Sequence, residues 1–121
     1  MRSPLDRATR ARLASQRVAD EISRACRGST TGRDLELHRD LTSTALSIVA
    51  ALDIIIRDNL RSDCTLLLGR AMRANLHLRR SLTDARGRGM FQEAEFLKLW
   101  ELVGEGTRLM HVLRNSTRVP D

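Results

Sequence analysis

Arg33 and His38 are the two residues whose types and spacing most directly suggest chemistry in this chain. A histidine can donate or accept a proton while a phosphodiester bond breaks, and an arginine can stabilise the charge that develops on the phosphate. The pair therefore supports the hypothesis of a ribonuclease, in which His38 acts as acid or base and Arg33 binds the phosphate.

The Arg-x4-His spacing is similar to that of helical HEPN-type ribonucleases, in which arginine and histidine flank the scissile phosphate. Its specificity is low, because a chain with twenty arginines and three histidines is expected to contain roughly one such match by chance. His38 also falls on the apolar side of its predicted helix, where a histidine packed into the core is the commoner occupant. The ribonuclease is therefore the alternative to a protein without catalytic residues.

A second set of residues could bind phosphate without catalysing a reaction. Steps of three, four and three residues place four side chains on one ridge of a helix, opposite Ala71 and Leu78: Arg70, Arg73, His77 and Arg80. Each could contact a phosphate without contacting a base. A weaker contribution is expected from a similar row nearer the N-terminus, Arg10, Arg17 and Arg24. Such rows are also typical of solvated helix faces, so both interpretations stay open.

The sequence predicts neither a metal site nor a cofactor site. The Glu-x-x-His pairs that hold metals in helical bundles are absent, and no glycine-rich phosphate loop occurs. Cys26 and Cys64 lie near the ends of different segments, and without an export signal they are expected to be reduced thiols. We expect no cofactor, no metal and no small-molecule substrate.

The elements that would position these residues are helices. Pro4 and Pro120 are the only prolines, and between them apolar residues recur at helical spacing with three polar or glycine-containing interruptions. The four remaining segments predict helices at about 5–27, 34–59, 62–86 and 92–115. Matched lengths and short connections predict an all-α fold, an antiparallel up-down-up-down four-helix bundle in a single domain.

Charge alternates along these segments within a net charge of +6. Residues 1–33 and 60–89 are strongly basic, whereas 34–59 and 90–121 are mildly acidic. In the predicted bundle the first and third helices lie diagonally, so every neighbouring pair would carry opposite charge. The pattern indicates electrostatic complementarity between helices, a basic surface for nucleic acid, or both. Aromatic residues make up only 2%, which argues against base stacking.

Two segments carry more apolar residues than one core-facing stripe requires. Leu102, Leu109 and Leu113 form a strip beside the core face of the fourth segment, and Ile54 and Ile56 widen the second. A bundle helix needs an apolar stripe about 100° wide, and excess apolar surface favours a partner. Self-association through these residues is the prediction, and a wider buried arc around the core is the alternative. The most apolar run, 45–56, is too short to span a membrane.

Three stretches carry a resemblance to a known family, at 41–49 (LTSTALSIV), 67–76 (LLGRAMRANL) and 89–97 (GMFQEAEFL), the last continuing into 102–110. In this order they resemble the bacterial four-helix bundle family that includes proteins encoded in 23S ribosomal RNA intervening sequences. The accessory variability protein of diversity-generating retroelements belongs to the same family. The similar positions are packing and turn patterns without catalytic residues.

The resemblance implies a cytoplasmic homo-oligomer, a five-membered ring of bundles without enzymatic activity. In the retroelement members it implies a basic surface that binds nucleic acid and a reverse transcriptase. This chain lacks the family's Asn-Ile-x-Glu-Gly element and has an unbroken apolar run, 49–56, in its place. The expected function is a self-assembling binding or scaffold protein with RNA or DNA as partner and no membrane association. A purely structural protein whose arginines only balance neighbouring helices is a further alternative.

Overall fold

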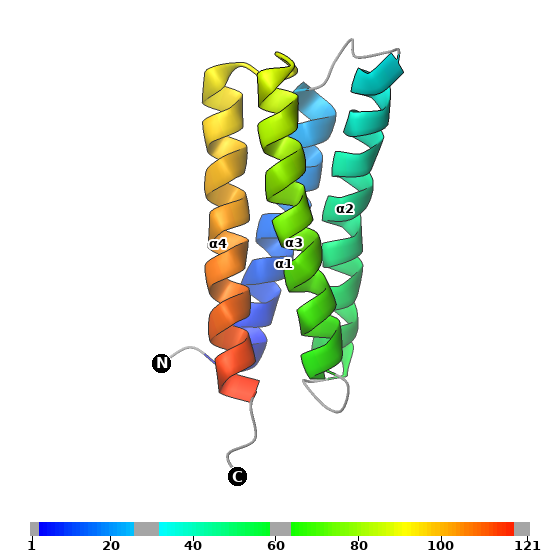
Figure 1. Ribbon diagram of the computed structural model, residues 1–121. Coiled ribbons are helices and arrows are strands. Elements are labelled where there is room, and N and C mark those ends of the chain that lie inside the picture. The colour runs from blue at the N-terminus through cyan, green and yellow to red at the C-terminus, as the bar shows by residue number, and fades with distance from the viewer. Residues whose placement is uncertain (1–2, 26–31, 59–63, 118–121) are drawn as a thin grey trace.

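Four long helices account for almost all of the described residues, which in this computed structural model are 3–25, 32–58 and 64–117 (Figure 1). The helices are α1 (Pro4–Ala25), α2 (Gly32–Arg57), α3 (Cys64–Gly87) and α4 (Glu93–Thr117). No strand occurs among the described residues. The predicted helix bounds agree to within two residues where they can be compared. The predicted ends at 26–27, 59 and 62–63 lie outside the described residues.

The helices form an antiparallel bundle in which each one contacts two neighbours. Within the described parts of the chain, α1 packs against α2 and α4, and α3 packs against the same two helices, whereas the diagonal pairs do not touch. Figure 1 shows the chain passing up and down the bundle, with both termini at one end. The predicted all-α, up-down-up-down four-helix bundle is therefore confirmed, and the basic helices α1 and α3 occupy diagonal positions.

The short connection between α3 and α4 follows from its backbone chemistry. Gly89 adopts a φ of 72°, a left-handed conformation that glycine reaches without strain. Its N–H donates to the carbonyl of Arg86 at 3.0 Å, and the N–H of Met90 donates to the carbonyl of Ala85 at 3.0 Å. This hydrogen-bond pattern is a Schellman motif, and the buried side chains of Met90 and Ala85 supply its apolar contact. The Glu95 carboxylate then accepts a hydrogen bond from the Gln92 N–H at the start of α4.

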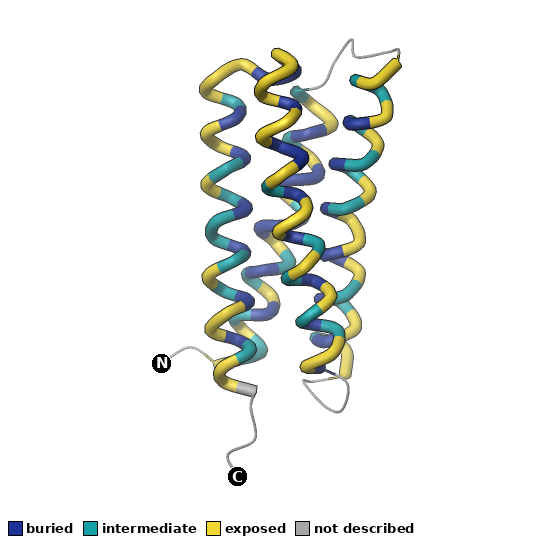
Figure 2. The backbone as a smooth tube through the Cα atoms, viewed as in Figure 1, coloured by how far each residue is buried: buried dark blue, intermediate teal, exposed yellow. Residues whose placement is uncertain are grey.

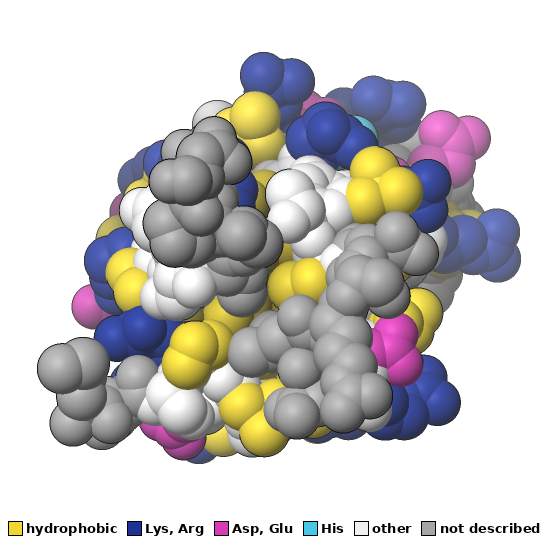
Figure 3. Space-filling model, turned by 90° about the horizontal axis from the view of Figure 1, so that it is seen from below, with side chains coloured by type: hydrophobic (Ala, Val, Ile, Leu, Met, Phe, Trp, Pro, Cys, Tyr) yellow, Lys and Arg dark blue, Asp and Glu magenta, His cyan; other side chains and the backbone are white. Residues whose placement is uncertain are grey.

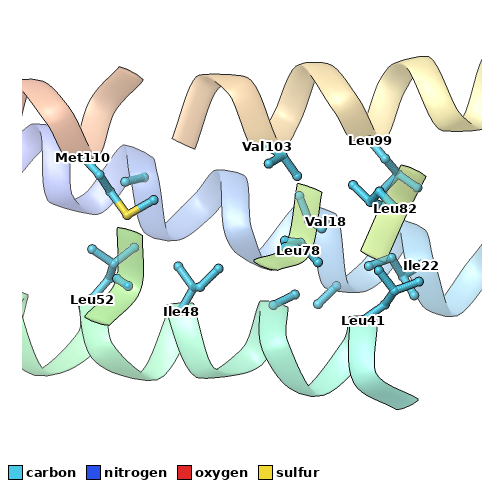
Figure 4. Close-up of a cluster of buried hydrophobic side chains, with 14 of the residues drawn as sticks. Val18, Ile22, Leu41, Ile48, Leu52, Leu78, Leu82, Leu99, Val103 and Met110 are labelled. Atoms are coloured by element: carbon cyan, nitrogen blue, oxygen red, sulfur yellow. The ribbon is translucent and has the colours of Figure 1, made fainter. Parts of the chain in front are cut away.

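The core runs along the bundle axis and consists almost entirely of aliphatic side chains (Figures 2 and 4). Small residues on α1 allow its neighbours to approach closely, and larger side chains of the other helices fill the space between them. Its largest fully buried members include Ile22, Leu41, Ile48, Leu52, Leu82 and Leu99. His38, predicted to lie on the core face of α2, is half-buried, whereas Leu37 beside it is buried. No helix in the described ranges is long and apolar enough to cross a membrane.

Cys64 is buried at the start of α3 and has a free thiol. Burial raises the pKa of the Cys64 thiol above its ordinary value, because the charged thiolate is poorly solvated there. Cys26 lies outside the described residues. Since the thiolate is the reactive form, Cys64 in the folded protein is expected to react with iodoacetamide at least about tenfold more slowly at pH 8 than in denaturant.

A Cys26→Ser variant isolates Cys64 for this measurement, which mass spectrometry can follow over time. Raising the pH through the pKa of the unfolded thiol is expected to favour the unfolded state, because only there does the thiolate form readily. Equal labelling rates with and without denaturant would contradict the buried position.

Candidate polyanion-binding surface

The basic row on α3 lies on the outer side of the bundle. Ala71 and Leu78 of this helix face the core and are almost completely buried. Four side chains from the same part of α3 lie on the opposite side of the helix, where all are exposed: Arg70, Arg73, His77 and Arg80. Arg70 and Arg80 are ten residues apart, which corresponds to about 15 Å along a helix. The structure therefore groups these four predicted residues on one surface.

Most basic side chains that point toward a neighbouring helix are paired with a carboxylate. Arg12 of α1 pairs with Asp53 of α2, and Lys98 of α4 lies 3.0 Å from Glu21 of α1. Further pairs between elements are Arg10–Glu105 (3.8 Å), Arg33–Asp84 (4.0 Å), Arg88–Asp34 (2.8 Å) and Arg86–Glu93 (2.5 Å). The alternating charge of the helices thus produces complementary pairs, although an exposed pair of this kind contributes at most about 1 kcal/mol.

Three arginines of the α3 row are exceptions to this pairing. Within the described residues, no carboxylate lies within ion-pair distance of Arg70, Arg73 or Arg80. Among the described residues, no acidic side chain compensates these three charges. Figure 3 views the bundle from the end that carries both termini, and basic side chains surround it on several sides. Exposed arginine is thus common on this protein, and the distinguishing property of α3 is three unpaired arginines on one face.

His77 differs from the arginines beside it because it belongs to a small polar cluster. Its Nε2 lies 2.9 Å from Asp40 Oδ2 on α2, and the Ser81 hydroxyl donates to the same oxygen at 2.9 Å. Ser81 Oγ is 3.5 Å from the same His77 Nε2. A catalytic Ser-His-Asp triad uses different ring nitrogens for the carboxylate and the serine. Here one nitrogen faces both groups, so the geometry is that of a polar link between α2 and α3.

This cluster could not be predicted from the sequence, because Asp40 lies 37 positions before His77 and 41 positions before Ser81. Helical periodicity predicts which face a residue occupies, but it does not predict the axial register of two helices. The only available signal was the spacing of His77 and Ser81, four residues apart on α3.

The predicted row on α1 does not extend the α3 surface. Arg10 is near Glu105, Arg24 is 3.4 Å from Glu21, and Arg17 is exposed. Because α1 and α3 are diagonal helices without mutual contact, the two rows lie on different sides of one bundle. A ligand that binds both rows would have to wrap around the protein or bridge two subunits.

Arg33 and His38 lie five residues apart near the start of α2 and have different surroundings. Five residues on an α-helix differ by about 140° in direction, so the two side chains leave α2 on different sides. The Arg33 guanidinium lies 3.7 Å from Glu36 and 4.0 Å from Asp84. His38 is half-buried, and its Nε2 is buried without a hydrogen-bond partner among the residues that the structure describes. Within the described residues, no group of three His, Cys, Asp or Glu side chains could hold a metal ion.

The predicted self-association residues fall into three groups. Leu113 has an exposed fraction of 0%, so its assignment to a subunit interface is wrong. Its side chain is buried in the core of its own bundle. Ile56, Leu102 and Leu109 are half-buried and pack against that core. Ile54 alone is exposed, at 38%. The apolar excess of α2 and α4 therefore serves largely to widen the buried arc, which was the alternative interpretation.

No protein-family model matches the chain, and comparisons with curated proteins and with solved structures returned no significant match. The resemblance to the four-helix bundle family of intervening-sequence proteins therefore stays a prediction. So does the five-membered ring that it implies.

Proposed function

We propose that this chain is a non-enzymatic binding or scaffold protein that holds a nucleic acid against the outer face of α3. The observation that carries this proposal is the row of three exposed arginines, Arg70, Arg73 and Arg80, without a carboxylate partner among the described residues. The guanidinium group presents several N–H donors to phosphate oxygens. A row about 15 Å long can contact several consecutive phosphates.

The same face offers little that could distinguish one base sequence from another. Trp100 is the single tryptophan, and it stacks on Phe96 with the Arg79 guanidinium 4.8 Å from its ring centre. Its ring is therefore already occupied by side chains of the same protein. Binding through phosphates positions a nucleic acid without reading its bases. The proposed binding is therefore expected to depend strongly on salt concentration and weakly on the base sequence of the nucleic acid.

Self-assembly is a second part of the proposal, supported by the outer face of α2. Leu46 and Ile54 are exposed there at 46% and 38%, with exposed Ala50 between them at helical spacing. This α2 strip, defined by Leu46, Ala50 and Ile54, is the apolar surface that a second subunit could cover. A ring of subunits would repeat the α3 row by symmetry and strengthen its field.

Light scattering with and without single-stranded RNA tests both parts in one experiment. We expect a mass several times that of the chain, five times if the family resemblance holds. RNA is expected to raise the mass at about 50 mM salt and to dissociate at about 200 mM, because bound phosphates release counterions.

The two parts can fail separately. A monomer that binds RNA at low salt would refute self-assembly and leave the α3 surface in place. Complexes equally stable at both salt concentrations would show that contacts other than phosphate pairing hold the RNA. An oligomer indifferent to RNA at about 50 mM salt would refute the nucleic-acid partner.

A further inference from the structure

The outer face of α4 carries one strip of residues on the side away from the core. Figure 2 shows the buried positions of α4 turned inward and its exposed positions along the outer side. The α4 strip consists of Leu97, Glu101, Gly104, Arg108 and Val112. At about 100° per residue these positions fall within an arc of about 80°. Leu97 and Val112 are exposed at 53% and 42%, and both charged members are exposed as well.

The α4 strip is complementary to itself when it is placed against an antiparallel copy. Its midpoint along the sequence lies just after Gly104. Leu97 and Val112 are equally far from this midpoint, on either side of it. Glu101 and Arg108 are also equally far from it. If two copies of α4 cross antiparallel at this point, each Glu101 meets Arg108 of the other copy, and each apolar end meets the opposite apolar end. The strip therefore offers two ion pairs and two apolar contacts to a second copy.

The two charged residues of the α4 strip have no ion-pair partner in their own chain. Within the described residues, no opposite charge lies within ion-pair distance of Glu101 or Arg108. They are seven residues apart, about 10.5 Å along the helix, so they do not pair with each other. Lys98 on the flank of the same helix differs, because it lies 3.0 Å from Glu21 of α1. The flank of α4 thus uses its charge within the bundle, whereas the strip presents one acid and one base outward.

Gly104 lies next to the crossing point and is not required by the packing of its own bundle. Among the described residues, a Cβ built on it would meet only Arg108 Nη1, at 3.6 Å. It lies within the α4 helix, where a glycine costs about 1 kcal/mol relative to alanine. The outer side of α4 is hollowed here, with Trp100, Gly104 and Arg108 among the lining residues. A glycine at the crossing lets the axes of two helices approach closely, because no side chain separates them.

We infer that two copies of this protein pair through their α4 strips in an antiparallel contact with two-fold symmetry. The partner is a second copy because the strip itself carries both members of each pair, so that every contact is made twice. The inference rests neither on nucleic-acid binding nor on the α2 strip. Helices α2 and α4 are diagonal and do not touch within the described parts of the chain, so their outer faces lie on opposite sides of the bundle.

The contact is limited to one helix of each copy, so it belongs with the weak interfaces that bury less than about 1,200 Å². We expect a dissociation constant on the order of 10–100 µM. In dilute solution the two copies then separate, and the Leu97 side chain is exposed to solvent as it is in the single chain.

Sedimentation velocity of the full chain with Ala50→Glu, at concentrations from about 5 to 300 µM, tests this inference. Ala50 is exposed in the α2 strip, and a glutamate there prevents a second subunit from covering that strip. Self-association that remains is therefore due to another surface. We expect this parent chain to reach the mass of two chains at the upper concentrations. A monomer at all concentrations would overturn the inference and would leave the α2 strip as the self-association surface.

Exchanging the two charges of the α4 strip tests the register of the pair. Glu101→Arg makes both charged positions basic, and Arg108→Glu makes both acidic. Each variant alone is expected to raise the dissociation constant at least about tenfold, because like charges then face each other twice. An equimolar mixture of the two variants is expected to dimerise within about threefold of the parent chain, because opposite charges face each other again.

The double variant, Glu101→Arg with Arg108→Glu, is expected to dimerise equally well. It keeps the net charge of the parent chain, so its pairing cannot result from a general attraction between oppositely charged proteins. Circular dichroism verifies that all variants remain helical. Single variants that dimerise like the parent chain would overturn α4 as the contact, and a double variant that stays monomeric would overturn the register.

A pair of glycine variants tests the crossing point. Gly104→Leu places a side chain between the two helices and is expected to weaken dimerisation at least about tenfold. Gly69→Leu is the matched control on α3, where a Cβ would meet only Arg73 Nη1, at 3.9 Å, and it is expected to leave dimerisation unchanged. Dimerisation of Gly104→Leu equal to that of the control would overturn the crossing at Gly104 and with it the inferred pair.

Discussion

Replacing Leu99 by alanine is expected to lower the free energy of unfolding by about 3 kcal/mol, a large fraction of the stability of a small domain. Leu99 lies in the second turn of α4 with an exposed fraction of 0%, among the cluster drawn in Figure 4. Removing its terminal atoms loses their transfer free energy and leaves a cavity that the surrounding core side chains can fill only in part.

Leu97→Ala is the matched control, two residues away on the same helix. Leu97 is 53% exposed, so its truncation removes little buried surface and is expected to change the free energy of unfolding by less than about 0.5 kcal/mol. Both variants keep the helix propensity of the site favourable, because alanine is the best helix former. The difference between them therefore measures burial.

Chemical denaturation followed by circular dichroism gives both values, provided that the protein concentration is held constant. Equal effects of the two substitutions would show that α4 is turned differently about its axis. A large effect of Leu97→Ala that disappears on dilution would instead place Leu97 in a contact between subunits.

Helical periodicity explains why the fold could be predicted from the sequence. The apolar spacing that defines each helix lies within one continuous segment of the chain. The turn between α3 and α4 is likewise defined locally, by Gly89 in its left-handed conformation and the following Met90. Diagonal placement of the basic helices followed from the same reasoning, because short connections make sequential helices neighbours. These features depend on spacing along one chain, which the sequence contains in full.

The finer assignments failed where they required the angle or register between helices. Leu113 was predicted to lie beside the core face of α4, yet it is fully buried. It follows Met110 by three residues, and it therefore shares the buried face of α4 with Met110. His38 was predicted to lie on the core face of α2, yet it is half-buried, while its neighbour Leu37, about 100° away around the helix, is buried. A hollow of about 370 Å³ between α3 and α4 could not be predicted from the sequence, because its shape depends on how two helices are turned toward each other.

Reversing the charge of the α3 row, by Arg70→Glu, Arg73→Glu and Arg80→Glu together, is expected to weaken binding of single-stranded RNA by about 100-fold or more at low salt. Each basic side chain close to an anionic surface contributes about 1 kcal/mol to the binding free energy. Three such contributions exceed the free energy of about 2.8 kcal/mol that corresponds to a 100-fold change in affinity. The slope of log affinity against log salt should also fall by about 2, since each lost phosphate contact contributes about 0.7 on a single strand.

A second triple variant with the same change in net charge makes this result specific. Arg39, Arg57 and Arg108 are exposed on α2 and α4, and within the described residues none of them has an ion-pair partner. Their replacement by glutamate lowers the net charge equally but leaves the α3 row intact.

Fluorescence anisotropy over a range of salt concentrations compares the two variants, and circular dichroism verifies that both remain helical. If the α3 row is the binding surface, the second variant retains most of the affinity and nearly the full salt slope. Equal losses would mean that RNA responds to the summed charge of an arginine-rich bundle, so that no single helix face would be the site.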